Sequence, residues 1–100
     1  MAREVIWTPR AQADLMAVSG YLDMEWGQRV KEAFLADVDE VIACIQLFPN
    51  IFRTSGHLDI REALVTKHNL LFYRVTEERI YLLSLWDTRQ DPGGRPYPNA

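Results

Sequence analysis

Two amphipathic helical patterns in tandem, separated by one glycine, constrain this chain more than any other feature. In the first, apolar residues recur every three or four positions, as one face of a helix requires: Ala11, Leu15, Val18, Leu22 and Trp26. After Gly27 the same spacing returns with Phe34, Val38, Val41, Ile45 and Phe48. Thr8–Pro9 ahead of the first pattern is typical of an N-cap followed by the first helical residue. The sequence therefore predicts a hairpin of two helices, ending at about Pro49.

Three β-prone runs follow the helices, at 58–66, 70–75 and 80–86, and the shorter run Val5–Trp7 precedes them. The turns between the three later runs are short enough for antiparallel hairpins. The last two runs are continuously apolar, which places them at the centre of a sheet, whereas the first alternates like an edge strand. We predict an α+β fold of order β-α-α-β-β-β, in which the two-helix hairpin packs on an antiparallel sheet of spatial order 1-4-3-2. In this arrangement the first strand would run antiparallel to the fourth.

Length and composition set the domain organisation. A chain of 100 residues with 48% hydrophobic and 25% charged residues suits one core, so residues 1–90 are expected to form a single domain. Residues 91–100 are rich in proline and glycine and are expected to form an extended tail. No run reaches the roughly 18 apolar residues of a membrane span, and no signal peptide precedes the first strand, so a cytoplasmic location without membrane contact is expected.

Familiar catalytic and metal-binding patterns are missing from the sequence. It holds no Gly-rich phosphate loop, HExxH, CxxC or G-x-S-x-G motif. His57 and His68 fall in predicted loops, and the single cysteine, Cys44, lies inside a helical pattern as a small apolar residue would. The sequence thus predicts no cofactor, no metal site and no hydrolytic centre. A net charge of −3 favours a protein partner over a phosphate backbone.

A set of arginines on or beside the strands is the feature most open to a functional interpretation. Arg61, Arg74 and Arg89, with Lys67 nearby, could hold RNA, anchor an acidic partner or form ion pairs within the chain. Asp87–Thr88–Arg89 is interpreted as one such pair within a short motif. The aromatic residues are interpreted first as core and second as lining a groove: Trp26, Phe52, Phe72, Tyr73 and Trp86.

Several local strings, in their order along nearly the whole chain, resemble the ParE/RelE toxin superfamily and in particular its ParE (plasmid stabilisation) branch. These strings are Ile6–Ala11, Asp14–Leu15, Tyr21–Leu22, Phe48–Pro49, Ile60–Glu62, Leu64–Val65, Leu71–Val75 and Leu85–Pro92. The last is the most specific, since it is similar to the D-x-R-x-x-P ending typical of ParE-like members.

The resemblance implies the toxin of a type II toxin–antitoxin system. Such a toxin would be neutralised in a hetero-oligomeric complex by a ParD-like antitoxin, and it would contact DNA only through that antitoxin. For the ParE branch the implied target is DNA gyrase, which is inhibited without catalysis by the toxin. For the RelE branch it is mRNA in the ribosomal A site, which is cleaved. An inactive homologue that only binds its antitoxin is a third alternative.

The positions that a RelE-type nuclease uses favour the ParE branch. In the resemblance, a third-strand arginine of the nuclease falls on Leu70 and a second-strand lysine falls on Ala63. Arg61 and Arg89 can match two other basic positions, and Tyr97 is a displaced counterpart of a C-terminal tyrosine. Because cleavage needs several converging charges, we expect no catalytic residues and a gyrase inhibitor.

The expected partner-binding residues fall into two groups. Leu22 and Trp26, at the end of the helical hairpin, are candidates for docking an antitoxin segment that folds on the toxin. Around the sheet, the candidates are Arg61, Tyr73 and Arg74. Asp87 and Arg89 are expected to organise the end of the sheet and to present the C-terminal segment to the target.

Overall fold

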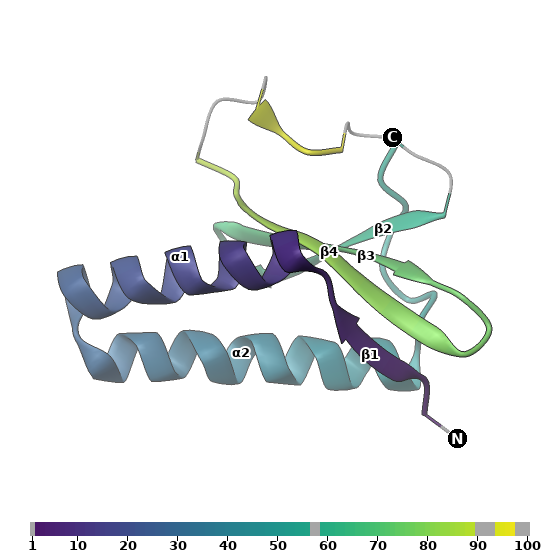
Figure 1. Cartoon of the computed structure of the whole chain (residues 1–100), viewed down its shortest axis with the longest axis horizontal. Coiled ribbons are helices and arrows are strands. Elements are labelled where there is room, and N and C mark those ends of the chain that lie inside the picture. Colours follow the sequence, from purple (N-terminus) through teal and green to yellow (C-terminus); the bar gives the residue numbers. More distant parts are fainter. Residues whose placement is uncertain (1, 57–58, 90–93, 98–100) are drawn as a thin grey trace.

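The computed structural model describes residues 2–56, 59–89 and 94–97 and has the predicted α+β order. Its elements are β1 (Glu4–Trp7), α1 (Pro9–Trp26), α2 (Gln28–Leu47), β2 (Ile60–Thr66), β3 (Asn69–Val75) and β4 (Arg79–Asp87). The two helices lie side by side against one face of the sheet (Figure 1). The predicted strand start at Leu58, the loop residue His57 and tail residues 91–93 and 98–100 lie outside the described residues. No helix in the described part of the chain is long and apolar enough to cross a membrane.

The sheet has the predicted order β1-β4-β3-β2, but the direction predicted for its first strand is wrong. β1 pairs with β4 in parallel, with Glu4 opposite Arg79 and Trp7 opposite Leu82. The reason lies in the helical hairpin, which returns the chain to the end of the sheet where β1 began, so that β2 starts in the same direction as β1. Two antiparallel pairings, β2 with β3 and β3 with β4, then reverse the chain twice. β4 therefore runs the same way as β1.

A single glycine separates the two helices. Gly27 has φ 94°, a backbone conformation that glycine adopts freely and other residues rarely do. Its N–H donates to the carbonyl oxygens of Leu22 and Asp23, both at 3.1 Å, which closes α1. Because α2 begins at the next residue, Gly27 is also its N-cap. The reversal between two long helices is thus made at one position.

The sheet has an apolar cluster on each face. The larger cluster lies between the sheet and the helices and includes Phe34, Val38, Ile45, Leu71 and Tyr73. The smaller one, formed by Leu70, Phe72 and Trp86, lies on the face that the helices leave open. The core interpretation is therefore confirmed for Phe72, Tyr73 and Trp86. It is wrong for Trp26, which is 67% exposed.

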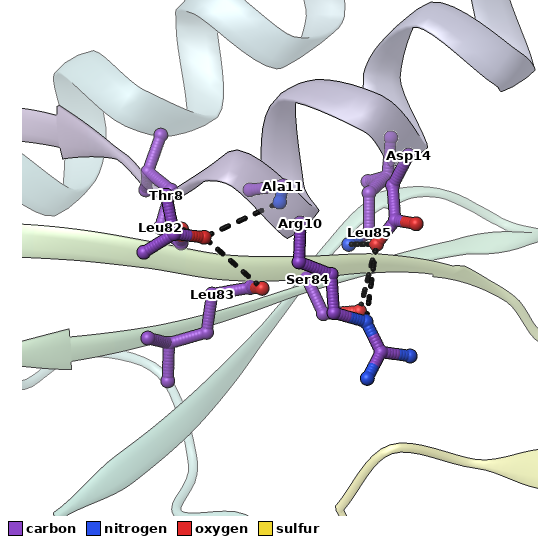
Figure 2. Close-up of polar contacts among 8 residues, drawn as sticks. All are labelled: Thr8, Arg10, Ala11, Asp14, Leu82, Leu83, Ser84 and Leu85. Carbon is purple, nitrogen blue, oxygen red and sulfur yellow. Dashed lines mark hydrogen bonds and ion pairs between the residues drawn. The ribbon is translucent and has the colours of Figure 1, made fainter.

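The start of α1 is fastened to an irregularity in β4. Between Phe72 and Tyr73 on β3 the register with β4 shifts, so that Leu83 has no partner across the ladder. The Asp14 carboxylate accepts hydrogen bonds from the Ser84 hydroxyl and the Leu85 N–H, both at 3.0 Å, as Figure 2 shows. The Thr8 hydroxyl donates to the Leu82 carbonyl at 2.7 Å and accepts from the Ala11 N–H (Figure 2). Asp14 of α1 and Thr8, the N-cap of that helix, thus satisfy polar groups at the β4 bulge.

Tyr73 fastens the loop after α2 to the middle of the sheet. Its side chain is fully buried, and its hydroxyl donates to the Pro49 carbonyl at 2.9 Å. The ring of Phe52 meets it edge-on at 6.3 Å between centroids. Burial raises the pKa of the Tyr73 phenol from 10.0 to about 12, while the nearby charge of Arg61 acts in the opposite direction. The phenol is therefore held neutral in the native protein.

Replacing Asp14 tests the fastening at the β4 bulge. We expect Asp14→Ala to lower the free energy of unfolding by about 1–3 kcal/mol, because it leaves buried donors at Ser84 and Leu85 without an acceptor. The measurement is a guanidinium unfolding curve, with Gln12→Ala, an exposed change in the same turn of α1, as the control. Equal stability of the two variants would contradict the role given to Asp14.

Replacing Tyr73 tests its buried phenol through pH. Because the native pKa is raised above that of the unfolded chain, this group's contribution to stability is complete below about pH 10 and is lost as the pH rises towards about 12. Near neutral pH, Tyr73→Phe should therefore have a free energy of unfolding lower by about 1 kcal/mol, because the hydrogen bond is lost. Between pH 10 and 12, the variant should lose less stability than the wild type. Tyr21→Phe, at an exposed position of α1, is the control. Parallel pH profiles for the wild type and Tyr73→Phe would contradict this account.

Candidate partner-binding groove

A groove runs along the tip of the helical hairpin where it meets the end of the sheet. It consists of two adjoining hollows of about 400 Å³ and 380 Å³, which share Leu22, Asn69 and Arg89. The first hollow is also lined by Ala17, Val18, Tyr21 and Asp87. The second is also lined by Trp26, Val30, Ala33, Phe34, Asp37, Thr66 and His68. We call the two together the tip groove.

The apolar wall of the tip groove exists because the helices are longer than the sheet they cover. The tip of the hairpin projects beyond the strands (Figure 1), so no strand covers the last part of the apolar stripes there. Trp26 is 67% exposed and Val30 is 41% exposed. Large apolar side chains gathered at one exposed site are typical of surfaces that bind another protein.

The polar wall is built by the Asp87–Arg89 motif at the end of β4. The Arg89 guanidinium donates from Nε and Nη2 to the two oxygens of the Asp87 carboxylate, at 3.1 and 2.8 Å. The Arg89 N–H also donates to Asp87 Oδ1, at 2.8 Å. These bonds lower the pKa of the Asp87 carboxyl and raise that of the Arg89 guanidinium. The predicted ion pair within this motif is confirmed, and it directs a charged guanidinium to the groove.

The turn between β2 and β3 forms the remaining rim of the groove. The His68 carbonyl accepts a hydrogen bond from the Thr88 N–H at 2.7 Å, which ties this turn to the end of β4. The Thr66 hydroxyl donates to Asn69 Oδ1 at 2.8 Å and accepts from the His68 N–H. His68 thus contributes to the rim through its backbone and lines the second hollow.

The structure brings together four of the seven sequence-predicted residues, Leu22, Trp26, Asp87 and Arg89, which all line the tip groove. The other three lie elsewhere. Tyr73 is buried, and Arg61 Nη1 donates to the Phe52 carbonyl at 2.7 Å, so that it holds the loop after α2. Arg74 is exposed next to Tyr73 on β3 and therefore lies on the open face of the sheet.

The three arginines therefore do not form one phosphate-binding cluster. Arg61 lies opposite Tyr73 and so shares the helix-facing side of β2, whereas Arg74 lies on the open face and Arg89 is paired at the tip groove. Of the four positions matched to basic residues of RelE-type nucleases, two, Leu70 and Ala63, are buried and apolar. Leu70 packs with Phe72 and Trp86, and Ala63 belongs to the core beneath the helices. Within the described residues, no group of three potential metal ligands is found.

Sequence reasoning missed two carboxylates that organise the fold. Asp14 joins α1 to β4, and Glu62 on β2 forms ion pairs with Arg53 and Arg95. The sequence did contain a signal for Glu62, because it lies two residues from both Ile60 and Leu64. It is thus a charged residue on the same side of the strand as two apolar ones. Asp14 appeared only within one of the family-like strings, and its role could not be predicted because its partners are 70 and 71 residues away.

Comparison with known proteins identifies the family. The family model for the ParE toxin of the type II toxin–antitoxin system, parDE, matches residues 5–92. No significant relative is found among curated proteins. Among solved structures, the fold is similar to that of the chromosomal ParDE system from P. aeruginosa, with TM-score 0.73 and 19% identity over 88% of this chain and 98% of that one. It is also similar to YoeB from Staphylococcus aureus, with TM-score 0.63 and 13% identity over 86% and 97% of the two chains.

The fold of the E. coli DinJ–YafQ toxin–antitoxin complex is similar as well, with TM-score 0.59 and 8% identity over 87% of this chain and 93% of that one. At these identities the solved structures show a shared fold. The family match is more specific, because it spans most of the chain and includes both walls of the tip groove. The chain therefore belongs to the ParE toxin family of type II toxin–antitoxin systems.

Proposed function

We propose that the chain is a growth-inhibiting toxin that a ParD-like antitoxin neutralises by docking an amphipathic segment in the tip groove. The observation that carries this proposal is the exposure of Trp26 and Val30 beside a hollow that is also lined by two charged residues of opposite sign, Asp37 and Arg89. A segment that folds on binding gains affinity by placing apolar side chains in such a groove. Contact with DNA would then be made by the antitoxin.

The Arg89 guanidinium at the groove can bind a partner that has a carboxylate near its apolar side chains. Arg89 is 60% exposed at its side chain although Asp87 occupies one edge of its guanidinium. The guanidinium has five N–H donors, and the ion pair uses two of them. A partner carboxylate can therefore be bound without breaking the pair.

For the target we propose DNA gyrase in the cytoplasm, inhibited without catalysis by this chain. One observation argues against a nuclease, and another favours contact with a protein. The matched nuclease positions Leu70 and Ala63 are buried apolar residues, so a phosphate in the transition state would find no cation there. Asp87 and Arg89, by contrast, form an ordered charged element at the end of β4, suited to holding a protein surface. An mRNA nuclease and an inactive homologue are alternatives that the experiments below distinguish.

The antitoxin proposal is tested by co-expression with the product of the adjacent upstream reading frame. We expect a stable complex and restored growth. Trp26→Ala should raise the Kd of that complex at least tenfold, because a truncated aromatic anchor costs more than about 1.4 kcal/mol. Met24→Ala is the matched control, since Met24 is an apolar residue of α1, 85% exposed, that does not line the groove. Equal Kd values for the two variants would place the antitoxin elsewhere, and failure of the neighbour to bind would remove the central proposal.

The target proposal is tested with Arg89→Ala in purified components. The wild-type toxin should block supercoiling by gyrase or accumulate cleaved plasmid, and leave translated mRNA intact. Arg89→Ala should lose at least tenfold in this activity while its melting temperature stays close to that of the wild type, because the pair is largely exposed. Cleavage of ribosome-bound mRNA with normal supercoiling would establish the nuclease alternative. Unchanged growth on induction without antitoxin would establish the inactive one.

A further inference from the structure

The open face of the sheet holds an aromatic and charged cluster that the tip groove does not use. Residues 94–97, yellow in Figure 1, lie across this face, on the side away from the helices. The guanidinium carbon of Arg95 lies 5.0 Å from the ring centroid of Phe72 and 5.7 Å from that of Trp86. The same guanidinium forms an ion pair with the Glu62 carboxylate. The Arg95 side chain is only 9% exposed, which is unusual for an arginine near a chain end.

The groups that receive Arg95 are fixed by the sheet. Glu62, Phe72 and Trp86 come from three adjacent strands, β2, β3 and β4, and each is buried. A buried carboxylate needs charged or hydrogen-bonding partners. The Arg53 guanidinium lies 2.5 Å from one oxygen of the Glu62 carboxylate, and the Arg53 side chain is 72% exposed. Arg95 pairs with the other oxygen. The strands thus present one carboxylate oxygen and two aromatic rings within reach of a single guanidinium, which is an arrangement that binds arginine.

Among the described residues, Arg95 leaves hydrogen-bonding capacity in this arrangement unused. Arg95 Nε and Trp86 Nε1 are both buried, and neither has a hydrogen-bond acceptor among the residues the structure describes. Buried donors of this kind are normally satisfied, and each one left without an acceptor reduces the stability of the bound state. An arginine carried by a peptide that also supplies a carbonyl or carboxylate oxygen here would satisfy both donors. These additional hydrogen bonds allow such a ligand to compete with Arg95, although Arg95 belongs to the same chain and the ligand must bind from solution.

We propose that Glu62, Phe72 and Trp86 form an arginine-binding site, which Arg95 fills within the chain and which accepts an arginine from an extended peptide segment of a partner protein. The ring of Tyr97 lies 5.1 Å from that of Phe72, so the segment at 94–97 itself shows the pattern that fits: an arginine, and an aromatic residue two positions later. The site lies on the other face from the helices and does not depend on the proposed antitoxin groove. Lysine fits it less well, because an ammonium group lacks the planar surface that stacks on both rings.

The proposal is tested by emptying the site and adding its own ligand as a peptide. The probe is acetyl-Gly-Arg-Pro-Tyr-amide, the sequence of residues 94–97, added to the ¹⁵N-labelled full chain carrying Arg95→Ala. We expect a saturable shift of the Trp86 indole N–H signal, assigned with Trp86→Phe. The wild type should need at least tenfold more peptide for the same shift, because Arg95 competes. Arg74→Ala is the matched control, since it removes an exposed arginine from the same face and should behave as the wild type.

Two further arms make the result decisive. A peptide with lysine in place of arginine should bind Arg95→Ala at least tenfold more weakly, and Glu62→Gln added to Arg95→Ala should abolish binding of the arginine peptide while the circular dichroism spectrum stays native. If the double variant does not fold, the lysine comparison decides. The proposal is overturned if folded Arg95→Ala does not bind the peptide, if it binds both peptides equally, or if the wild type binds as tightly. It is also overturned if the wild type is a dimer that Arg95→Ala converts to monomers, because the occupant would then be a second copy of the chain.

Discussion

The hydrogen bonds between Asp14 and the β4 bulge are the contact on which the arrangement of both layers depends. A bulge removes backbone groups from the ladder, and in the middle of a sheet these groups are far from water. Here the carboxylate of α1 satisfies the N–H of Leu85 and the hydroxyl of Ser84, while Thr8 serves the Leu82 carbonyl. The direction of α1 across the sheet is fixed by these bonds, and with it the position of the hairpin tip. The geometry of the tip groove therefore depends on a contact near the other end of α1.

The two faces of the sheet serve different purposes because different elements cover them. The helices bury the larger cluster and extend past the strands, which leaves Trp26 without a cover. The opposite face receives the short segment at 94–97, which brings an arginine where the sheet presents a carboxylate. Apolar surface therefore remains exposed at the hairpin tip. On the open face, the Arg95 guanidinium instead covers aromatic rings and pairs with a carboxylate. The two surfaces proposed to bind partners therefore differ in chemistry and lie on separate parts of the domain.

Local periodicity was sufficient to predict the elements of this fold, and long-range pairing was not. The stripes on either side of Gly27 define both helices, and the apolar character of the last two runs indicated their place at the centre of the sheet. The parallel direction of β1 was mispredicted because direction depends on how many times the chain reverses between two distant strands. Trp26 continues the apolar stripe of α1 in sequence, yet it is exposed because the sheet ends before the helix does. Helix length relative to sheet width is not a local property.

The contacts of the candidate site likewise include some between neighbours in the sequence and others between distant residues. Asp87 and Arg89 are two residues apart, so their pairing could be expected from sequence alone. Leu22 was predicted as a docking residue separately from this pair, and only the whole fold shows that the three line one hollow. The partners of Glu62 lie 9 and 33 residues away, and its place between charged neighbours is a property of the finished sheet.

The parallel pairing of β1 with β4 also bears on the order in which the parts of this protein form. The first strand has its partner about 75 residues later, as Glu4 opposite Arg79 illustrates. Chains are synthesised from the N-terminus, and contacts between distant segments form late in folding. During translation the helical hairpin is complete long before β4 leaves the ribosome, so its apolar tip emerges without Asp87 and Arg89 beside it. The tip groove is therefore complete only after β4 has been synthesised.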